Sequence, residues 1–362
     1  MRVAIAVHHV RPTGGQDRYA LELARHLAGS VEMELIAMRA EGVPPGVAVR
    51  LVRPRAGPML LRAELFARAA ARLVSAGRYD VVHTVGGALP GASVVTAQFC
   101  HPAWAAVRPP ASPYQRLVTW QATRDERRAY RHRNLRAVIA VSQRTGREIA
   151  AHYGPLSVPL SVIPNGVDLE GFAPASGREP GRRPTLLFVG AYERKGLDVA
   201  IRALARLRHD AQLRAVGEGA RGRFARLAAQ LGVGDRVHLE PPRGDIAAAF
   251  READVFVFPT RYDPFGMVIA EAMATGLPVV TSAAAGAADL ITDGVSGRIV
   301  TDPEDAASFA AALEDLLEAP ETRHAMGRAA RDAVREIGWD RIAARTLEVY
   351  RMAAAGGAER TP

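Results

Sequence analysis

Cysteine is nearly absent from this sequence of 362 residues, which contains it only at position 100. A single cysteine excludes an intramolecular disulfide, so a reducing compartment fits the chain best. Long apolar runs are missing as well, since no stretch reaches the ~18–20 apolar residues that a membrane-spanning helix needs. Residues 2–7 already read as a strand and are too short for the apolar core of a secretory leader. These absences predict a cytoplasmic protein.

Patterns that indicate metal or hydrolytic chemistry are absent too. The sequence has no Asp-x-Asp pair, which argues against a metal ion that bridges a diphosphate to the protein. It has no group of His, Cys and Asp with the spacing of a zinc site, and no Gly-x-Ser-x-Gly elbow. The sequence therefore predicts no metal site and no resident cofactor.

Lysine is as rare as cysteine. Lys195 is the single lysine among 47 basic residues, and the rest are arginine. A GC-rich coding background explains such a bias without reference to function. Against that background, the one retained lysine suggests that a compact ammonium is needed at this position.

Positive charge is abundant, and the formal net charge is +9. This excess indicates an anionic partner, which the charge alone leaves open among a phosphorylated substrate, a membrane surface and nucleic acid. Several of the arginines lie within a predicted helix at 124–136, close to Trp120 and Tyr130. Such a helix docks on anionic lipid or on a phosphorylated acceptor, although a solvated helix face explains the pattern equally well.

Strand and helix patterns alternate along the chain. The first part has predicted strands at 2–7, 34–38, 47–52, 79–83, 93–98 and 136–142. The alternation restarts with strands at 185–190, 213–217, 237–239, 254–259, 279–281 and 297–301. Residues 174–184, rich in proline, glycine and arginine, read as a linker. The sequence thus predicts an α/β protein with doubly wound parallel sheets in domains 1–173 and 185–338, and a terminal helix and tail at 339–362.

The most informative stretch is residues 259–282, PTRYDPFGMVIAEAMATGLPVVTS. Gly266 precedes a helix-forming run, so backbone N–H groups at the start of that helix can face an anion. Asp263 lies in the loop before the helix, and Glu271 lies about a turn and a half inside it, with its side chain leaning back toward the N-terminus. A phosphate cradle between two carboxylates suits a nucleotide-sugar. An ordinary loop–helix–strand unit with a surface Glu is the alternative.

Other candidate residues follow predicted strands, where ligands of doubly wound sheets bind. Arg194 and Lys195 place two cations there, ahead of Gly196, and both side chains suit phosphate, although a solvated loop has the same composition. The loops at Gly14-Gly15 and at Gly217 let a backbone approach a ligand, but each is weak evidence alone. His101 lies at the end of the strand predicted at 93–98 and so could face a ligand there. His8 and His83 are its rivals, and a buried structural histidine explains each of the three equally well.

These residues together resemble the retaining GT-B glycosyltransferases of family 4 and group 1. In that family two Glu flank seven residues that contain Phe-Gly, and here Asp263 stands at the first of these positions, shorter by one methylene. The segment PNGVD at 164–168 resembles the one that closes the first domain of the family. Adjacent Arg194-Lys195-Gly196 resembles the branch of lipopolysaccharide-core glucosyltransferases. The resemblance covers nearly the whole chain and implies a GT-B fold of two Rossmann-like domains, with the last helix crossing back onto the first.

The resemblance also implies a function. It predicts a metal-independent hexosyltransferase that moves a hexose, with retention, from a UDP- or GDP-sugar to a hydroxyl of a glycan, glycolipid or small molecule, in cell envelope polysaccharide biosynthesis. The basic helix adds a possible peripheral contact with the anionic inner face of a membrane, and no nucleic-acid partner is expected. The implied catalytic residues are Arg194, Lys195, Asp263 and His101. The implied donor-binding residues are Gly14, Gly15, Gly217, Phe265, Gly266, Met267, Val268 and Glu271.

In the implied mechanism, Arg194, Lys195 and backbone N–H groups stabilise the leaving diphosphate. Glu271 holds the ribose hydroxyls, and Asp263 holds hydroxyls of the donor sugar.

Two other classes of protein remain open at this point. One is a different GT-B enzyme, a sugar epimerase or a phosphorylase. A phosphorylase needs a lysine that carries a cofactor, and Lys195 is the sole candidate. The other is a non-catalytic protein that binds nucleic acid or membrane, which only the positive net charge suggests.

Overall fold

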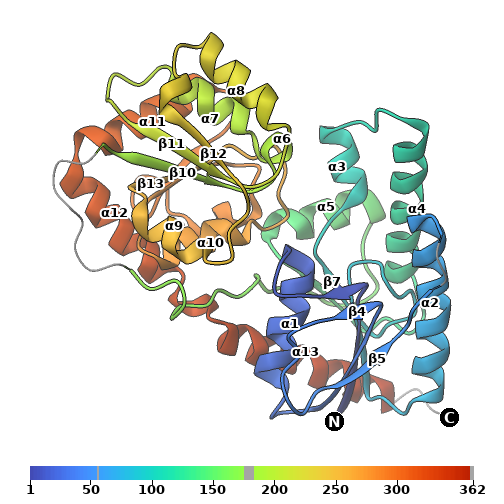
Figure 1. Cartoon of the computed structure of the whole chain (residues 1–362). Coiled ribbons are helices and arrows are strands. Elements are labelled where there is room, and N and C mark those ends of the chain that lie inside the picture. The colour runs from blue at the N-terminus through green and yellow to red at the C-terminus, as the bar shows by residue number, and fades with distance from the viewer. Residues whose placement is uncertain (55–56, 175–182, 359–362) are drawn as a thin grey trace. The chain divides into compact units, whose positions relative to one another are not determined.

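The computed structural model describes residues 1–54, 57–174 and 183–358. The chain divides into two compact units, Met1–Gly166 with Trp339–Pro362, and Val167–Gly338 (Figure 1). Residues 167–173, which the sequence analysis placed at the end of the first domain, therefore belong to the second unit. Most of the predicted linker, residues 175–182, lies outside the described residues.

The first unit is built on a seven-stranded sheet whose paired strands are all parallel. Its strand order is β5-β3-β1-β6-β7-β8-β9. Both faces are covered by helices, so the central strands are almost continuously apolar, as in the run RVAIA of β1. The strands are β1 (Arg2–Ala6), β3 (Glu32–Ala37), β5 (Ala48–Leu51), β6 (Val81–Val85), β7 (Val94–Ala97), β8 (Ala137–Ala140) and β9 (Leu160–Val162).

The helices of this unit are α1 (Gly15–Leu27), α2 (Met59–Ala76), α3 (His101–Val107), α4 (Pro113–Tyr130), α5 (Gln143–Tyr153) and α13 (Trp339–Ala358). A short two-stranded sheet pairs β2 (His9–Val10) with β4 (Arg39–Ala40). The basic helix predicted at 124–136 ends earlier, at Tyr130, because α4 stops before the turn that leads into β8. None of the helices in the described part of the chain is long and apolar enough to cross a membrane.

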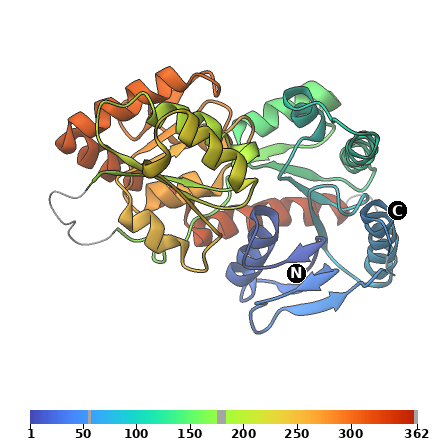
Figure 2. The ribbon, with the colours of Figure 1, turned by 45° about the horizontal axis from the view of Figure 1, so that its top comes forward.

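The last helix, α13, packs beside α1 and against β6 of the first unit (Figure 2). The hydroxyl of Tyr350 lies 2.7 Å from Nδ1 of His83, and both side chains are fully buried. Burial lowers the pKa of His83 to about 3, so this imidazole is neutral at physiological pH. His83 is therefore one of the structural histidines that the sequence analysis allowed for.

The second unit contains a six-stranded parallel sheet in the order β12-β11-β10-β13-β14-β15. Its core stacks the rings of Phe256 and Phe258, 5.6 Å apart, next to Phe188. The strands are β10 (Thr185–Val189), β11 (Gln212–Val216), β12 (Val237–Glu240), β13 (Val255–Phe258), β14 (Val279–Ser282) and β15 (Arg298–Val300).

The helices of the second unit are α6 (Tyr192–Lys195), α7 (Leu197–Leu204), α8 (Arg221–Gln230), α9 (Ile246–Glu252), α10 (Met267–Ala274), α11 (Ala306–Glu318) and α12 (Pro320–Ala333). Short 3₁₀ turns occur at Gly234–Arg236, Gly286–Leu290 and Arg335–Ile337. The turn at Gly286–Leu290 lies against the loop at 263–265. The N–H groups of Gly286 and Ala287 donate to the carbonyls of Asp263 and Phe265 in that loop.

Candidate functional site

Two loops of the second unit meet because their strands are neighbours. Strands β10 and β13 pair in parallel, so the loops that leave their carboxyl ends emerge at the same edge of the sheet. Gly196 lets these loops touch. It has a φ of +80°, and a Cβ at this position would lie 2.1 Å from the carbonyl oxygen of Pro259. Only glycine fits here, which is why it follows the Arg-Lys pair.

Lys195 ends α6 and turns inward. Its side chain is nearly buried, and Nζ donates to Oδ2 of Asp263 across the two loops. The ammonium also lies 5.3 Å from the centroid of the Phe258 ring. Burial lowers the pKa of Lys195 from 10.5 to about 8, with a smaller lowering by Arg194 and an opposing increase from Asp263. The lysine is therefore mostly protonated at neutral pH, but a small rise in pH above neutrality begins to deprotonate it.

The loop that carries Asp263 is fixed through its backbone. The N–H of Asp263 donates to the carbonyl of Ala284, and its own carbonyl accepts from Gly286, at 3.1 and 2.8 Å. Gly266 then adopts a φ of +94° as the N-cap of α10. This conformation, which glycine adopts without strain, aims the first N–H groups of α10 toward the strand ends. Met267 and Val268, partly exposed, provide those first N–H groups, and Phe265 is buried behind them.

Glu271 lies in the middle of α10 and is 3% exposed. It is a charged group in a helix whose other residues from Ile269 to Ala274 are also buried. A carboxylate is retained in such a position only when it is hydrogen-bonded or has a functional partner. Asp263, Gly266 and Glu271 thus lie on one continuous loop and helix, as the spacing in the sequence predicted.

Arg261 is a residue that the sequence analysis missed. Its guanidinium forks onto Asp198 of α7 at 3.1 and 2.8 Å, donates to both oxygens of Glu304, and also reaches the carbonyl of Glu193 in α6 at 3.1 Å. These acceptors raise its pKa, against the effect of burial. Arg261 therefore ties the segment that carries Arg194 and Lys195 to the loop that carries Asp263. Its position two residues before Asp263 was the only signal.

Gly217 lies where β10 and β11 end. A Cβ there would lie 2.0 Å from the carbonyl oxygen of Gly190, so the two loops approach each other as closely as backbones can. A pocket of about 260 Å³ opens beside this contact, lined by both glycines together with Glu218, Arg243 and Ile246 among others. Arg194 is partly exposed nearby on α6 and makes no ion pair with any residue in the described ranges.

In the first unit, the Gly14-Gly15 loop leads from β2 into α1. Gly14 has a φ of +87° and is the N-cap of α1, and Gly15 is the first residue of that helix. Both glycines are exposed, and a Cβ at Gly15 would meet nothing within 4 Å. An ion pair between Arg11 and Asp17, at 2.7 Å, closes the loop at its base.

His101 is the first residue of α3, not the last residue of a strand. The chain turns into a helix there because Pro102 occupies its second position, where a missing N–H costs nothing. Nδ1 of His101 lies 2.6 Å from Oε1 of Glu126, and its backbone N–H donates to the other oxygen. Glu126 is 3% exposed and also accepts the hydroxyl of Tyr153. This arrangement fixes the ring and leaves Nε2 as the nitrogen available to a ligand.

A pocket of about 610 Å³ lies against His101 and Glu126, beneath the first turn of α2. Phe99, Val118 and Leu60 give it apolar walls, and Arg62 adds a cation. His8 and His9 line it as well, and burial lowers the pKa of each, that of His8 to about 4. Glu126 was missed by sequence reasoning because it is surrounded by arginines in a helix that read as basic.

Within the described ranges, the group with the spacing of a metal site is His209, Glu314 and Glu318. Arg208 donates to both carboxylates, so a cation already occupies this cluster. Its members lie in the turn after α7 and on α11, away from the loops that carry the candidate residues.

Comparison with known proteins gives two family matches. The family "Glycosyl transferases group 1" matches residues 172–333, and "Glycosyltransferase Family 4" matches residues 13–170. A protein named D-inositol 3-phosphate glycosyltransferase from Xylanimonas cellulosilytica is 31% identical over 97% of this chain and 97% of its own length. One of the same name from Nocardiopsis dassonvillei is 37% identical, but the match spans 59% of this chain and only 55% of that protein.

Solved structures show the same fold. WaaG, described as a glycosyltransferase involved in lipopolysaccharide biosynthesis, has a TM-score of 0.81 at 23% identity and covers 96% of this chain and 99% of its own. Sucrose-phosphate synthase from Thermosynechococcus elongatus has a TM-score of 0.82 at 23% identity and covers 98% of this chain and 99% of its own.

Proposed function

We propose that this chain, which belongs to the GT-B glycosyltransferases with a family 4 domain and a group 1 domain, transfers a hexose from a nucleoside diphosphate-sugar to a hydroxyl group. The single observation that carries the proposal is the buried contact between Lys195 and Asp263 next to the start of α10. UDP- and GDP-sugars are the donors we propose, with retention of configuration and without a metal ion.

The cationic end of this site suits a leaving diphosphate. Charge develops on the diphosphate as the bond to the sugar breaks, and preorganised donors at that point lower the barrier. Lys195 supplies a fixed ammonium, Arg194 supplies a guanidinium that has no carboxylate partner among the described residues, and the first N–H groups of α10 supply a third positive element. A buried cation is worth more here than an exposed one, because water screens it less.

The two carboxylates take different roles in this proposal. Glu271 projects from α10 and accepts hydrogen bonds from the ribose hydroxyls. Oδ2 of Asp263 accepts from Lys195, while the contact of Oδ1 within the described ranges is a long one, 3.4 Å, from the N–H of Phe265. One oxygen of Asp263 thus remains for a hydroxyl of the donor sugar, and the other holds the catalytic lysine. Gly217 and Gly190 leave space for the nucleoside at the adjacent pocket.

The pocket of the first unit is our candidate for the acceptor. His101, oriented by Glu126, presents Nε2 toward a hydroxyl, and Arg62 offers a cation to an acidic group. A phosphorylated small molecule is one acceptor class consistent with these residues, since the relatives are named for D-inositol 3-phosphate. A glycan or a glycolipid is the other, which the apolar walls favour. Gly14 and Gly15 are proposed to approach the donor phosphates.

Peripheral membrane contact on the cytoplasmic side, as part of cell envelope synthesis, is a further element of the proposal. Large apolar side chains are exposed on α2 and α4, with Met59, Leu117 and Trp120 each at least half exposed. The guanidinium of Arg124 lies 5.5 Å from the centroid of the Trp120 ring. Aromatic and basic side chains on one helix are typical of surfaces that lie in a lipid interface.

Release of nucleoside diphosphate from a panel of UDP- and GDP-sugars tests the proposed activity, first without and then with candidate acceptors. We expect slow release without an acceptor and faster release with the right one. Lys195→Ala should lower turnover by roughly 100-fold or more, by analogy with the loss of one oxyanion donor. Arg202→Ala, an exposed change on α7, serves as the matched control and should leave turnover unchanged.

The alternatives give different results in the same experiments. An epimerase would convert the nucleotide-sugar without net transfer, and a phosphorylase would require inorganic phosphate and a lysine-bound cofactor. A thermal-shift assay with the same nucleotide-sugars adds a test of binding. If no nucleotide-sugar raises the melting temperature of the protein and none releases nucleoside diphosphate, the transferase proposal is wrong, and a basic binding protein becomes the better account.

A further inference from the structure

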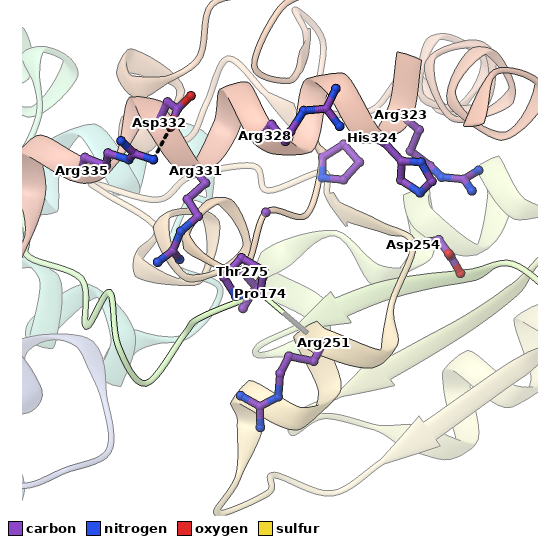
Figure 3. Close-up of a pocket in the computed structure, with 12 residues that line it drawn as sticks. Pro174, Arg251, Asp254, Thr275, Arg323, His324, Arg328, Arg331, Asp332 and Arg335 are labelled. Carbon is purple, nitrogen blue, oxygen red and sulfur yellow. Dashed lines mark ion pairs between the residues drawn. The ribbon is translucent and has the colours of Figure 1, made fainter. Parts of the chain in front are cut away.

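A second concavity lies at the opposite edge of the sheet of the second unit. Its volume is about 590 Å³, within the range of small-molecule sites. Its lining residues lie just before β13 and β14, where these strands begin, and on one side of α12 (Figure 3). Ligands of the proposed transfer reaction bind where these strands end, so this pocket is a separate place on the unit.

Arginine dominates the lining of this pocket. Among the described residues, six basic side chains from α9, α12 and the turn that follows α12 surround it, against two carboxylates. One of the carboxylates, Asp254, accepts the N–H of Thr185, and the other, Asp332, pairs with an arginine. The pocket therefore carries an excess of positive charge. The six basic residues are Arg251, Arg323, His324, Arg328, Arg331 and Arg335.

Two of the arginines build the wall. Arg331 donates to the carbonyls of Phe172, Leu169 and Ala274, and so caps the C-terminal end of α10. Arg323 donates one N–H to the carbonyl of Leu316 at the end of α11. The Nε of Arg323 is buried and has no hydrogen-bond partner, although a buried donor of this kind normally has one.

The other cations keep donors available. Arg328 and His324 lie one turn apart on α12, both exposed, and neither forms a hydrogen bond or ion pair with a residue in the described ranges. Among the described residues Arg335 pairs with Asp332, in an ion pair that is mostly exposed. Arg251 has two long contacts, at 3.4 Å to a carbonyl and at 3.8 Å to Asp245. Exposed pairs of this kind are worth little and exchange readily for a ligand.

We propose that this pocket is a binding site for a multiply charged phosphate anion, held between Arg251, Arg323, Arg328 and Arg335. Guanidinium groups fork onto phosphate oxygens, and several of them in one cavity match an anion with two or more phosphate groups better than a single carboxylate. The structure offers the exposed head of Arg328, which has no partner among the described residues, and the head of Arg335, whose ion pair with Asp332 is mostly exposed.

The site does not depend on the proposed transferase activity, but α10 connects the two places. This helix begins beside Gly266 at the proposed donor site and ends at Ala274, whose carbonyl accepts from Arg331. An anion that binds among these arginines therefore sits against the far end of the helix that carries Glu271.

Isothermal titration of the full chain with inositol hexakisphosphate and with inorganic tripolyphosphate tests the proposal. The same titrations are repeated with Lys195→Ala, which removes a cation from the proposed donor site. The test variant replaces the two most exposed arginines, Arg328→Gln with Arg335→Gln. The matched control replaces two exposed arginines of α8, Arg223→Gln with Arg226→Gln, which removes the same charge from the same unit. Titration of vesicles that contain anionic phospholipid, against neutral vesicles, distinguishes a lipid headgroup from a free anion.

We expect one anion to bind per chain, with affinity at least tenfold weaker in the Arg328/Arg335 variant and unchanged in the control. Binding to anionic vesicles alone, with the same response to the variants, would also support the site and would identify its ligand as a lipid headgroup. Equal weakening in both variants would overturn the proposal, because it would show only a general response to net charge. Weakening by Lys195→Ala as large as that in the Arg328/Arg335 variant would overturn it too, because it would place the anion at the donor site.

Discussion

Replacement of Asp263 by asparagine tests how the ammonium of Lys195 is controlled. The two side chains form a buried ion pair in which Lys195 is 6% exposed, and Asp263 is the contact that keeps the lysine protonated against the cost of burial. Asparagine is close to aspartate in size and still offers an oxygen. The substitution therefore removes a charge and leaves the packing of the loop nearly unchanged.

The pKa of Lys195 sets the size of the effect on rate. With a pKa of about 8, the lysine is ~90% protonated at pH 7 and only ~10% protonated at pH 9. If the ammonium neutralises the leaving diphosphate, kcat/KM of the native protein falls about tenfold per pH unit above pH 8. In Asp263→Asn the pKa of Lys195 is lower still, because the carboxylate that raised it is gone. The alkaline fall then begins at a lower pH.

The same pKa shift has a defined effect on stability. The pKa of Lys195 is lowered on folding from 10.5 to about 8, so the unfolded chain binds more protons between these two values. The contribution of Lys195 to the free energy of unfolding is therefore unfavourable by roughly 3 kcal/mol below pH 8, and this penalty fades as the pH rises toward 10.5. In Asp263→Asn at pH 7, neutralising the lysine costs about 1.4 kcal/mol, while the asparagine oxygen still accepts a hydrogen bond from Nζ.

The assay is donor turnover measured from pH 6 to pH 10, with urea unfolding in the same buffers. Asp315→Asn, an exposed aspartate that pairs with Arg298 in the same unit, serves as the control and should keep the native profile. An alkaline fall at the same pH in Asp263→Asn and in the native protein would refute this reasoning, even if the variant were slow. It would show that a group other than Lys195 titrates.

Three further substitutions test other parts of the structure. Arg261→Met should lower the free energy of unfolding in urea by about 1–3 kcal/mol, because the partly buried Asp198 and the carbonyl of Glu193 lose their donor, and Arg261→Lys should recover only part of that loss. Glu126→Gln should reduce acceptor turnover by about 10-fold or more while donor binding by calorimetry stays the same, because the ring of His101 loses the carboxylate that orients it. Gly196→Ala should cost about 3 kcal/mol or more by thermal unfolding, whereas Gly244→Ala, where a Cβ meets nothing within 4 Å, should cost under about 1 kcal/mol.

Several features of the fold could be read directly from the sequence. Apolar runs such as 2–6 and 255–258 are the buried parallel strands, and their ends shift by only one or two residues from the predicted ones. The stretch 259–282 forms the predicted loop, helix and strand in that order. The GT-B fold, inferred from the order of the motifs, is confirmed by the structural comparisons.

Contacts between distant residues could not be read in the same way. Lys195 and Asp263 are 68 positions apart, and nothing in either motif says that one side chain will contact the other. His101 was expected at a strand end, but the proline that follows it begins α3 and turns it toward Glu126 on another helix. Arg261 looked like one arginine among many, and its importance lies in three acceptors from three separate segments.

The sequence by itself determined the elements of this protein, because periodicity, glycine conformation and turn chemistry act over a few residues. It also selected the residue types at each strand end, including the only lysine in the chain. The tertiary structure alone decided which of these residues meet. Strand order brings β10 beside β13, which places Lys195 against Asp263. Burial of the pair then lowers the pKa of the lysine to about 8. Those effects depend on distance and burial, which a linear pattern does not contain.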